Sequence, residues 1–384
     1  MTNLILQTLF WLSLSGLAYV YLGYPLLVRV LSKIRPLRRV RQPADPSQRV
    51  SVVIACHNDA ERIRVKLNEL LWSEQADLVG EILIGSDGST DHISDVIASI
   101  GDKRIRLFEF ADRRGKPAVL NDLIPQCSNE IVVLCDARQV LSERAIPALL
   151  ANFADPSVGV VSGELTFRDT GNESSAGRGI GAYWRYEKMI RKCEASFRSV
   201  PGATGALYAI RKSLFQPIAP TTLLDDVVIP MQAIVSGSRC VFEPEAIAWD
   251  DPSASLGQEA VRKRRTIAGA AQLLLHHPSW LLPWKNRIWF EFVSHKVLRL
   301  ASPPMLFAVA VTNVLLAADP LYRMLLVFQL SFYCSALAGW VFQKTGRSSS
   351  LFGVQLMFLT LNATTVAALW DAVRGRFRVT WQKA

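Results

Sequence analysis

The sequence predicts an α/β domain built on a mostly parallel sheet flanked by helices, with transmembrane helices on both sides of it in the chain. The first observation is an alternation of short apolar runs with amphipathic segments between about residues 49 and 249, which is typical of right-handed βαβ units. The second is a long uncharged apolar stretch before this region and three apolar stretches after it. Half of the 384 residues are hydrophobic and the mean hydropathy is +0.20, a high value for a soluble protein.

The chain opens with an apolar segment. No charged residue occurs between Asn3 and Val28, and about 20 apolar residues suffice to cross a bilayer. The segment is too long for the core of a signal peptide, and it lacks a basic leader and a small-residue cleavage site. We therefore expect a retained transmembrane anchor over residues 1–31, followed by a basic linker over residues 32–48.

Part of the net charge of +10 is concentrated in one short segment of the chain. The linker begins with the basic cluster SKIRPLRRVRQ beside the predicted anchor, and such clusters mark the cytoplasmic side of a membrane span. Anionic lipid headgroups are sufficient partners for these arginines, so we expect contact with a lipid bilayer and no nucleic-acid partner. The six cysteines are scattered, without metal-ligand spacing, as expected in a reducing compartment.

Four β-branched runs in the middle of the chain predict strands, at residues 49–56, 81–87, 105–110 and 130–136. The helical spacing of apolar residues predicts helices between them, at residues 59–73, 91–100 and near 117–127. Asn58 or Asp59 can cap the first of these helices. In sheets of this kind, ligands bind outside the carboxyl ends of the strands. The residues that follow the strands are therefore the candidates for a binding site.

Three of the four predicted strands end in acidic or amide side chains. These ends are His57-Asn58-Asp59, Asp87-Gly88-Ser89 and Asp136-Ala137-Arg138. One such group alone is the usual mark of a helix cap, but the three together favour a nucleotide or metal site at one edge of the sheet. Gly115-Lys116 precedes the third helix, where an ammonium group and a helix start together make an anion site. The alternative for this last pair is a solvated basic turn.

Three apolar segments near the C-terminus are candidate membrane spans, at residues 302–318, 321–342 and 351–370. They fall within a predicted transmembrane region of residues 301–373. The first is short for a span, and Asn362 lies in the middle of the last.

The stretch over residues 279–300 combines Trp and Phe with Lys and Arg and predicts an amphipathic helix in the membrane interface. The basic tail, residues 374–384, raises a conflict. If all three apolar segments cross, the tail lies on the far side, against the positive-inside tendency. Either one segment does not cross, or the tail breaks the tendency.

Taken in this order, the motifs resemble those of the family 2 glycosyltransferases of the GT-A fold, specifically the membrane-anchored synthases of extracellular polysaccharides such as hyaluronan-type synthases. The likeness covers roughly residues 49–300, and SDGSTD at residues 86–91 is its most specific motif. It implies a nucleotide-sugar-binding catalytic domain over residues 49–278. It also implies that the nucleotide of a UDP-sugar contacts the turns after the first two strands, at Asn58, Asp59, Asp87 and Gly88.

The element GKPAVLN, at residues 115–121, resembles the Gly-Lys motif of the same family. The resemblance implies that Lys116 lies near the nucleotide and that Asn121 supports it. Asp136 falls at the first position of the family's Asp-x-Asp motif, which normally holds Mg²⁺ or Mn²⁺ against the sugar diphosphate. The second position is Arg138, and a guanidinium cannot be a ligand of these cations. Either Asp136 holds the metal with diphosphate and water alone, or Arg138 partly replaces the metal by pairing with phosphate; we favour a phosphate or acceptor role for Arg138.

The segment TTLLDDVV, at residues 221–228, resembles the family's Thr-Glu-Asp segment, and the resemblance implies that Asp226 is the general base. A sugar hydroxyl attacks poorly until a positioned carboxylate takes its proton. The alternative is that Asp225 and Asp226 only cap a helix that starts at Val227.

The basic run RKRRT, at residues 262–266, lies where processive members carry Gln-x-x-Arg-Trp. Arg262 and Arg265 are therefore expected near the departing diphosphate, where Arg265 offsets the developing charge. Thr266 stands in place of the tryptophan that would stack on acceptor sugar, which argues against long processive synthesis. A basic run near a membrane could instead face lipid headgroups.

Together these expectations describe a multi-pass protein of the cell inner (plasma) membrane with a cytoplasmic catalytic domain. It would be an inverting glycosyltransferase that moves a sugar from a UDP-sugar to a hydroxyl of a glycan or lipid-linked acceptor in extracellular or capsular polysaccharide synthesis, alone or with other polysaccharide-synthesis subunits. One alternative is sugar transfer to a polyprenyl phosphate, which would not need Asp226. The other is a catalytically silent subunit of a polysaccharide synthesis or export complex.

Overall fold

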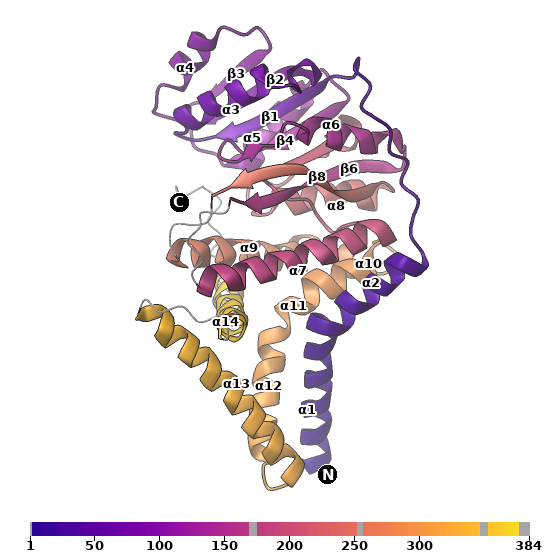
Figure 1. Ribbon diagram of the computed structural model, residues 1–384, viewed down its shortest axis with the longest axis vertical. Helices are drawn as coiled ribbons and strands as arrows, with labels where there is room; N and C mark the ends of the chain where they lie inside the picture. Colours follow the sequence, from indigo (N-terminus) through magenta and orange to yellow (C-terminus); the bar gives the residue numbers. More distant parts are fainter. Residues whose placement is uncertain (1, 169–174, 252–255, 346–351, 376–384) are drawn as a thin grey trace.

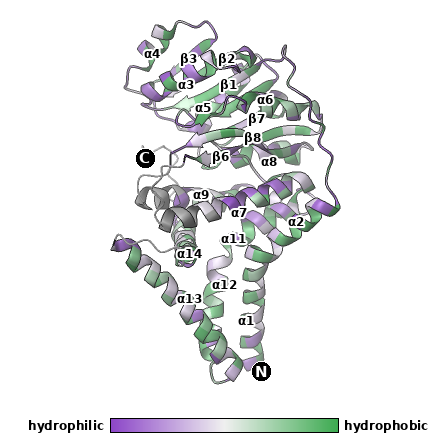
Figure 2. Cartoon of the chain, in the orientation of Figure 1, coloured by the Kyte–Doolittle hydropathy of each residue, from purple (hydrophilic) through white to green (hydrophobic). Residues whose placement is uncertain are grey.

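The computed structural model describes residues 2–168, 175–251, 256–345 and 352–375 of the chain. Figure 1 shows three tiers along the long axis of the molecule. A β-sheet with its covering helices forms one end, long helices lie beneath it, and apolar helices, green in Figure 2, form the other end, where the N-terminus lies. The predicted combination of an α/β domain with apolar helices is therefore confirmed.

The sheet has eight strands in the order β3-β2-β1-β4-β7-β6-β8-β5. The strands are β1 (Val50–Cys56), β2 (Val79–Asp87), β3 (Ile105–Phe110), β4 (Ile131–Cys135), β5 (Val140–Leu141), β6 (Val158–Phe167), β7 (Leu207–Arg211) and β8 (Arg239–Asp250). β1 to β4 are parallel, β7 runs against both β4 and β6, β8 is parallel to β6, and β5 runs against β8. All described strands except β5 and β7 therefore share one direction, as the prediction of a mostly parallel sheet required.

Helices cover both faces of the sheet. They are α3 (Ala60–Trp72), α4 (Ile93–Ile100), α5 (Lys116–Leu123), α6 (Ala145–Leu150) and α8 (Asp225–Val235), with the short 3₁₀ turns η2 (Ala76–Leu78), η3 (Ile124–Gln126), η4 (Ala151–Ala154) and η5 (Lys212–Leu214). The first three of these helices coincide with the helices that the sequence predicts. Every residue of β1 is buried, as expected for a strand whose two faces are both covered.

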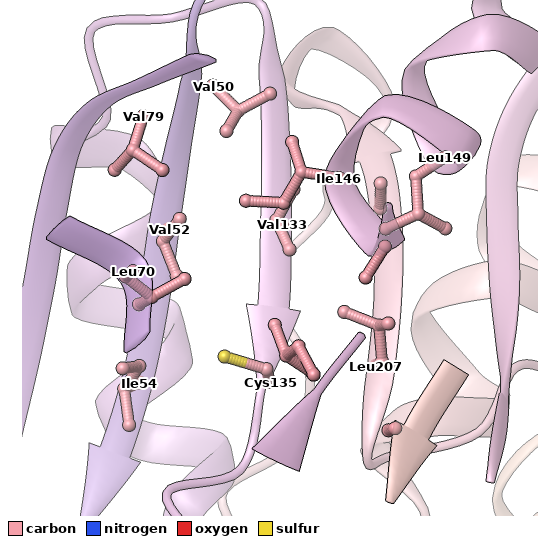
Figure 3. Packing of buried hydrophobic residues seen from close by; sticks show 14 of the residues in the cluster. Val50, Val52, Ile54, Leu70, Val79, Val133, Cys135, Ile146, Leu149 and Leu207 are labelled. Carbon is pink, nitrogen blue, oxygen red and sulfur yellow. The ribbon is translucent and has the colours of Figure 1, made fainter. Parts of the chain in front are cut away.

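The core has two halves, one on each face of the sheet. Val52 and Ile54 of β1 point into the half shared with Leu70 of α3 and Ile146 of α6, as Figure 3 shows. Val53, which lies between them, points to the other half, among residues of α5 and α8. This alternation follows from the two-residue period of a strand, and it fixes the register that brings the strand ends to one edge.

Two long helices, α7 (Ser175–Phe197) and α9 (Leu256–His276), lie between the sheet domain and the apolar helices (Figure 1). The N-terminal segment consists of α1 (Thr2–Ala18), the π-helical turn η1 (Tyr19–Gly23) and α2 (Tyr24–Ile34), and the C-terminal helices are α12 (Ser302–Leu315), α13 (Pro320–Lys344) and α14 (Gly353–Val373). Three helical segments are long and apolar enough to cross a membrane: Thr2–Ile34, Pro320–Lys344 and Gly353–Val373.

The stretch predicted as one interface helix, residues 279–300, is broken into short pieces. These are η6 (Pro278–Leu281), α10 (Trp289–Phe292), the π-helical turn η7 (Val293–Val297) and α11 (Leu298–Leu300). The segment Trp289–Leu300 then meets Ser302–Leu315 at a bend of 55°. Prolines at the start of α12 remove backbone donors and end the preceding helix at this point.

Polar side chains join the N-terminal segment to the middle tier. The Tyr24 hydroxyl donates to Glu194 of α7 at 2.5 Å, and the same glutamate contacts Nδ1 of His295 at 2.7 Å. The Tyr19 hydroxyl meets Ser294 Oγ at 2.8 Å, which links the two π-helical turns η1 and η7. Buried polar groups need such partners, so these contacts fix the direction in which α1 leaves the domain.

Candidate active site

The carboxyl ends of β1, β2 and β4 lie side by side because these strands are parallel neighbours. Cys56, the last residue of β1, pairs with Ser86, which precedes Asp87. On the other side of β1, Val53 pairs with Leu134, two residues before Asp136. The structure thus brings together the three strand ends that the sequence identifies.

The turns after β1 and β2, residues 57–59 and 87–91, are joined by hydrogen bonds; we call them the β1–β2 turns. Asn58 has a positive φ of 53°, a conformation that asparagine adopts more readily than most residues. Its N–H donates to Ser89 Oγ at 3.1 Å, and its Oδ1 accepts from the N–H of Thr90 at 2.7 Å. His57 Nδ1 lies 2.7 Å from the carbonyl oxygen of Asp87.

The predicted cap of helix α3 is wrong. Asp59 occupies the N-cap position without making a side-chain cap, and its carboxylate instead pairs with Arg62 at 3.0 Å. Asp91, from the neighbouring turn, accepts the N–H of Ala60 at 2.8 Å. Because the capping carboxylate comes from a segment 31 residues away, local sequence could not identify it.

Asp87 is fully buried, and its carboxylate binds the main chain ahead of α5. Oδ1 accepts from the N–H of Arg114 and Oδ2 from the N–H of Gly115, both at 2.8 Å. Gly88 has a φ of +62°, and a Cβ there would come within 2.8 Å of the Arg113 nitrogen. Asp87 therefore holds the loop that presents Lys116, and Gly88 permits the close approach of that loop.

Lys116, at the start of α5, lies between two carboxylates. Its Nζ is 2.8 Å from Asp136 Oδ1 and 3.4 Å from Asp225 Oδ2, and the lysine side chain is 10% exposed. Burial disfavours the ammonium, but Asp136 and Asp225 outweigh this effect and hold the pKa of Lys116 above its ordinary value. Lys116 is therefore a fixed cation at the sheet edge. Its partner Asp225 was not anticipated.

Asp226 is the next residue along α8. Its Oδ2 accepts from the N–H of Gly205 at 3.0 Å. Burial, followed by repulsion from Asp225, raises the pKa of Asp226 to about 6, against the opposing charges of Lys116 and Lys296. We call Asp136, Asp225 and Asp226 the carboxylate cluster. The alternative that the two acids cap a helix from Val227 is wrong, because α8 begins at Asp225 and has no side-chain cap.

Tyr208 of β7 belongs to this site and was missed by the sequence analysis. It is completely buried, and its hydroxyl has no hydrogen-bond partner within the described parts of the chain. Burial, then the charges of Asp225 and Asp226, raises the pKa of Tyr208 well above its ordinary value. The phenol is therefore neutral, and its O–H is a buried donor near Asp225 and Asp226. Its place on a buried strand gave no signal in the sequence.

Arg138 pairs with an acid at the end of another strand. Its Nη2 lies 2.6 Å from Oδ2 of Asp250, the last residue of β8, and Gln139 Nε2 lies 3.1 Å from the same oxygen. Asp250 is 3% exposed, so the pair joins the turn after β4 to the end of β8. Asp250 is the last residue of an apolar strand, as Asp87 is the last residue of β2. This shared pattern could have identified Asp250 as a candidate from the sequence.

The remaining predicted residues lie on or beside α9 and α5. Arg265 is a partly buried residue of α9, whereas the side chain of Arg262 lies outside the described residues. On the same helix, Gln272 accepts from the N–H of Leu223 at 2.9 Å and donates to the carbonyl of Thr221 at 2.8 Å. α9 thus packs on the loop that leads to Asp225. Asn121 of α5 binds both main-chain groups of Ile218, at 2.7 and 2.9 Å.

A divalent cation does not fit the ligands that the described side chains present. No group of three or more His, Cys, Asp or Glu side chains in these residues is arranged to hold a metal ion. Asp136 and Asp225 share the ammonium of Lys116, and Arg138 is not a ligand for hard cations. Cationic side chains thus occupy the place where carboxylates would hold a metal.

The chain is similar to known proteins at the levels of family, sequence and fold. The model of "Glycosyltransferase like family 2" matches residues 46–269. Two curated relatives are each named poly-beta-1,6-N-acetyl-D-glucosamine synthase. The protein from Staphylococcus aureus strain COL is 26% identical over 238 residues, which is 60% of this chain and 57% of the relative. The protein from Staphylococcus epidermidis strain RP62A is 26% identical over 258 residues, 63% of this chain and 60% of the relative. The chain therefore spans about three-fifths of the length of these relatives.

Among solved structures, the mannosyltransferase PcManGT from Pyrobaculum calidifontis, in complex with GDP-Man and Mn²⁺, matches with a TM-score of 0.71. The match covers 96% of this chain and 99% of that chain, at 20% sequence identity. At this identity the likeness shows the fold alone. It confirms the GT-A fold expected from the sequence and extends it to the arrangement of the apolar helices.

Proposed function

The chain belongs to the glycosyltransferase-like family 2 and is a glycosyltransferase related to exopolysaccharide synthases, and from this premise we propose its substrates and mechanism. We propose that it transfers a sugar from a UDP-sugar to a hydroxyl of a glycan or lipid-linked acceptor, with inversion at the anomeric carbon. The sheet edge would bind the donor, the β1–β2 turns holding the nucleoside. The carboxylate cluster would lie at the reacting atoms.

One observation carries this proposal: Asp226 is a partly exposed carboxylate with a pKa of about 6, held in position by the N–H of Gly205. A general base works best when its pKa lies near the working pH, because it is then ionised and still able to take a proton. The N–H of Gly205 fixes one oxygen of Asp226 and leaves the other to face an acceptor. Perturbed acids of this kind concentrate at active sites.

In the proposed step the acceptor oxygen attacks the anomeric carbon from the face opposite the diphosphate. The new bond joins the acceptor oxygen to the anomeric carbon, and the bond from that carbon to the diphosphate oxygen breaks. Asp226 takes the hydroxyl proton and becomes a neutral carboxylic acid, while UDP leaves with the electron pair of the broken bond. The proton on Asp226 then passes to solvent, which restores the base.

Cations of the chain would offset the charge that develops on UDP. The ammonium of Lys116 lies beside Asp136 at the sheet edge. In the proposed complex it would pair with a phosphate oxygen of the donor. Arg265 and Arg262 would approach from α9, as fixed donors whose charge stabilises the departing diphosphate. PcManGT was solved with Mn²⁺, and Mg²⁺ or Mn²⁺ is the cofactor that this likeness suggests. The described side chains do not form a site for such an ion.

The apolar helices support a location in the cell inner (plasma) membrane, with several crossings. The basic linker that follows α2 supports a catalytic domain on the cytoplasmic side, where nucleotide sugars are made available. The names of the curated relatives support an acceptor in extracellular polysaccharide synthesis, alone or with other synthesis subunits.

A panel of UDP-sugars and GDP-sugars tests the proposal. Purified full-length protein in lipid nanodiscs should release UDP from one or more UDP-sugars when a glycan acceptor is added, and the Asp226→Asn variant should not. Release by Asp226→Asn at the wild-type rate, with polyprenyl phosphate as acceptor, would establish the alternative acceptor instead. Release from GDP-sugars alone would overturn the choice of nucleotide. Parallel reactions with EDTA and with added Mn²⁺ test the role of a metal.

A further inference from the structure

Helix α14 takes a different course from the other apolar helices. Figure 1 views α14 almost end-on, while α1, α12 and α13 run along the plane of the picture. Its 21 residues span about 31 Å at 1.5 Å per residue, enough to cross a bilayer. Length and composition therefore do not decide whether it crosses, but its neighbours do.

The contacts of α14 lead from α13 toward the middle tier. Its first turn lies near Gly339, in the last part of α13, where a Cβ would come within 3.0 Å of Phe352. Phe358, in its second turn, packs edge-on against Tyr21 of η1 and against Phe332, near the middle of α13, with ring centroids 5.0 and 5.7 Å apart. η1 lies at the junction of α1 and α2, next to the middle tier. A helix that crossed would instead end near the turn between α12 and α13.

The last part of α14 touches the catalytic domain. Ala368 is fully buried in a cluster with Ala268 of α9 and Leu223, which lies two residues before Asp225. Asp371 Oδ2 pairs with Nε of Arg264, the neighbour of Arg265 on α9, at 2.7 Å. α14 thus lies beneath α9 and reaches the segment that carries the candidate base.

The two faces of α14 differ in polarity in the sense expected for a helix between protein and lipid. The face against the protein contains its small and polar residues, Asn362, Thr365, Ala368 and Ala372. The adjoining face is apolar and exposed: Ala363, Val366, Trp370 and Val373. Arg374 lies over the Trp370 ring at 4.3 Å, and tryptophan with a neighbouring arginine is typical of the headgroup level of a membrane. The polar Asn362 therefore does not face lipid.

We infer that α14 lies along the cytoplasmic interface of the bilayer, with this apolar face (Ala363, Val366, Trp370 and Val373) in lipid and its polar face against α9. The chain then crosses the membrane three times, through the N-terminal segment, through the bent pair Trp289–Leu300 and Ser302–Leu315, and through α13, and the tail at residues 374–384 returns to the cytoplasmic side. This resolves the conflict between the three apolar segments and the positive-inside tendency. The apolar segment that does not cross is the last.

Labelling with a membrane-impermeant maleimide in intact cells tests the inference, in full-length protein whose exposed Cys334 is changed to Ser. Ala384→Cys should be labelled only after the membrane is permeabilised. The matched control, Ala318→Cys in the exposed turn between α12 and α13, should be labelled from outside in intact cells. Labelling of Ala384→Cys from outside would overturn the inference.

A C-terminal fusion of the full chain gives a second, independent readout. Green fluorescent protein at the C-terminus should fluoresce, and alkaline phosphatase at the same place should be inactive, because the first folds in the cytoplasm and the second needs export. An active phosphatase with a dark fluorescent protein would establish a fourth crossing. Neither experiment depends on donor, acceptor or activity, so failure of the proposed function would leave this result intact.

Discussion

The β1–β2 turns and the carboxylate cluster lie at the same sheet edge but are held in different ways. The turns are joined by hydrogen bonds of Asn58 with Ser89 and Thr90, and the buried Asp87 accepts from two main-chain amides of the loop before α5. The cluster depends on one ammonium shared between carboxylates. Hydrogen bonds to amides persist across a wide range of pH, whereas the charge of the cluster changes near neutrality. The β1–β2 turns are therefore a fixed surface, and the carboxylate cluster is the part that titrates.

The largest effect is expected in the carboxylate cluster. Asp226→Asn removes the proton acceptor, and loss of a general base lowers kcat by about 10²–10⁴-fold. Donor affinity should change little, because Asn can still accept from Gly205. Initial rates of UDP release, together with donor binding by calorimetry, measure both. Equal losses in kcat and donor affinity would contradict the division between the two regions.

In the β1–β2 turns, the main effect of Asp87→Ala should be a loss of stability. It leaves the N–H groups of Arg114 and Gly115 without an acceptor, at about 1–3 kcal/mol for each unsatisfied buried group. The midpoint of denaturant unfolding should fall, and donor affinity should fall because Lys116 is no longer presented. Asp112→Ala, an exposed site in the same loop, is the matched control. Wild-type stability in Asp87→Ala would show that the turns are not held as described.

The Arg138–Asp250 pair joins the turn after β4, which carries Asp136 of the carboxylate cluster, to the end of β8. Arg138→Ala should lower the free energy of unfolding by about 2 kcal/mol, the order expected for a hydrogen bond to a charged group. Arg138→Asp places a second acid beside the buried Asp250, and it should lower both stability and activity more than Arg138→Ala does. A double-mutant cycle with Asp250→Asn measures the coupling. Higher Mn²⁺-dependent activity in Arg138→Asp would instead show that position 138 is a metal-ligand position.

The pH dependence separates the regions directly. Because Asp226 must be ionised to act, kcat/KM should rise about tenfold per pH unit up to about pH 6 and then level off, as for a single ionising base. The stability change has the opposite sense. Burial raises the pKa of Asp226 above its ordinary value, so its contribution to stability is complete below about pH 4 and is lost as pH rises through about 6. Asp226→Asn should therefore melt higher than wild type at pH 7 and equally at pH 4.

The smallest effect is expected for the ion pair between α14 and α9, which contacts the carboxylate cluster only indirectly. Asp371→Asn breaks an ion pair with the half-exposed Arg264, and such pairs contribute about 0.2–1 kcal/mol. Activity in nanodiscs should fall less than fivefold, and Arg264→Gln should give no further loss in the double variant. A drop as large as that of Asp226→Asn would mean that α14 does more than brace α9.

The sequence predicted the strand ends well because their signals are local. An apolar run closed by Asp87 or Asp136 can be read from a few residues, and the parallel order of strands then brings these residues together. The partners of these residues were not predictable in the same way. Asp225 meets Lys116, and Asp250 meets Arg138 across 112 residues, and no local pattern encodes such a pairing. The prediction of one helix over residues 279–300 was wrong for a different reason. Prolines and a π-helical turn interrupt a stretch whose composition suits one helix.

The contacts of α1 also have a consequence for biosynthesis. Trp11 donates to the hydroxyl of Tyr322 at 3.0 Å, across 311 residues of sequence. At roughly 5–20 residues per second of synthesis, this contact cannot form until about 15–60 s after Trp11 has been made. For that interval α1 lacks the packing partners that α12 and α13 later provide. α1 is thus synthesised long before its tertiary contacts can be completed.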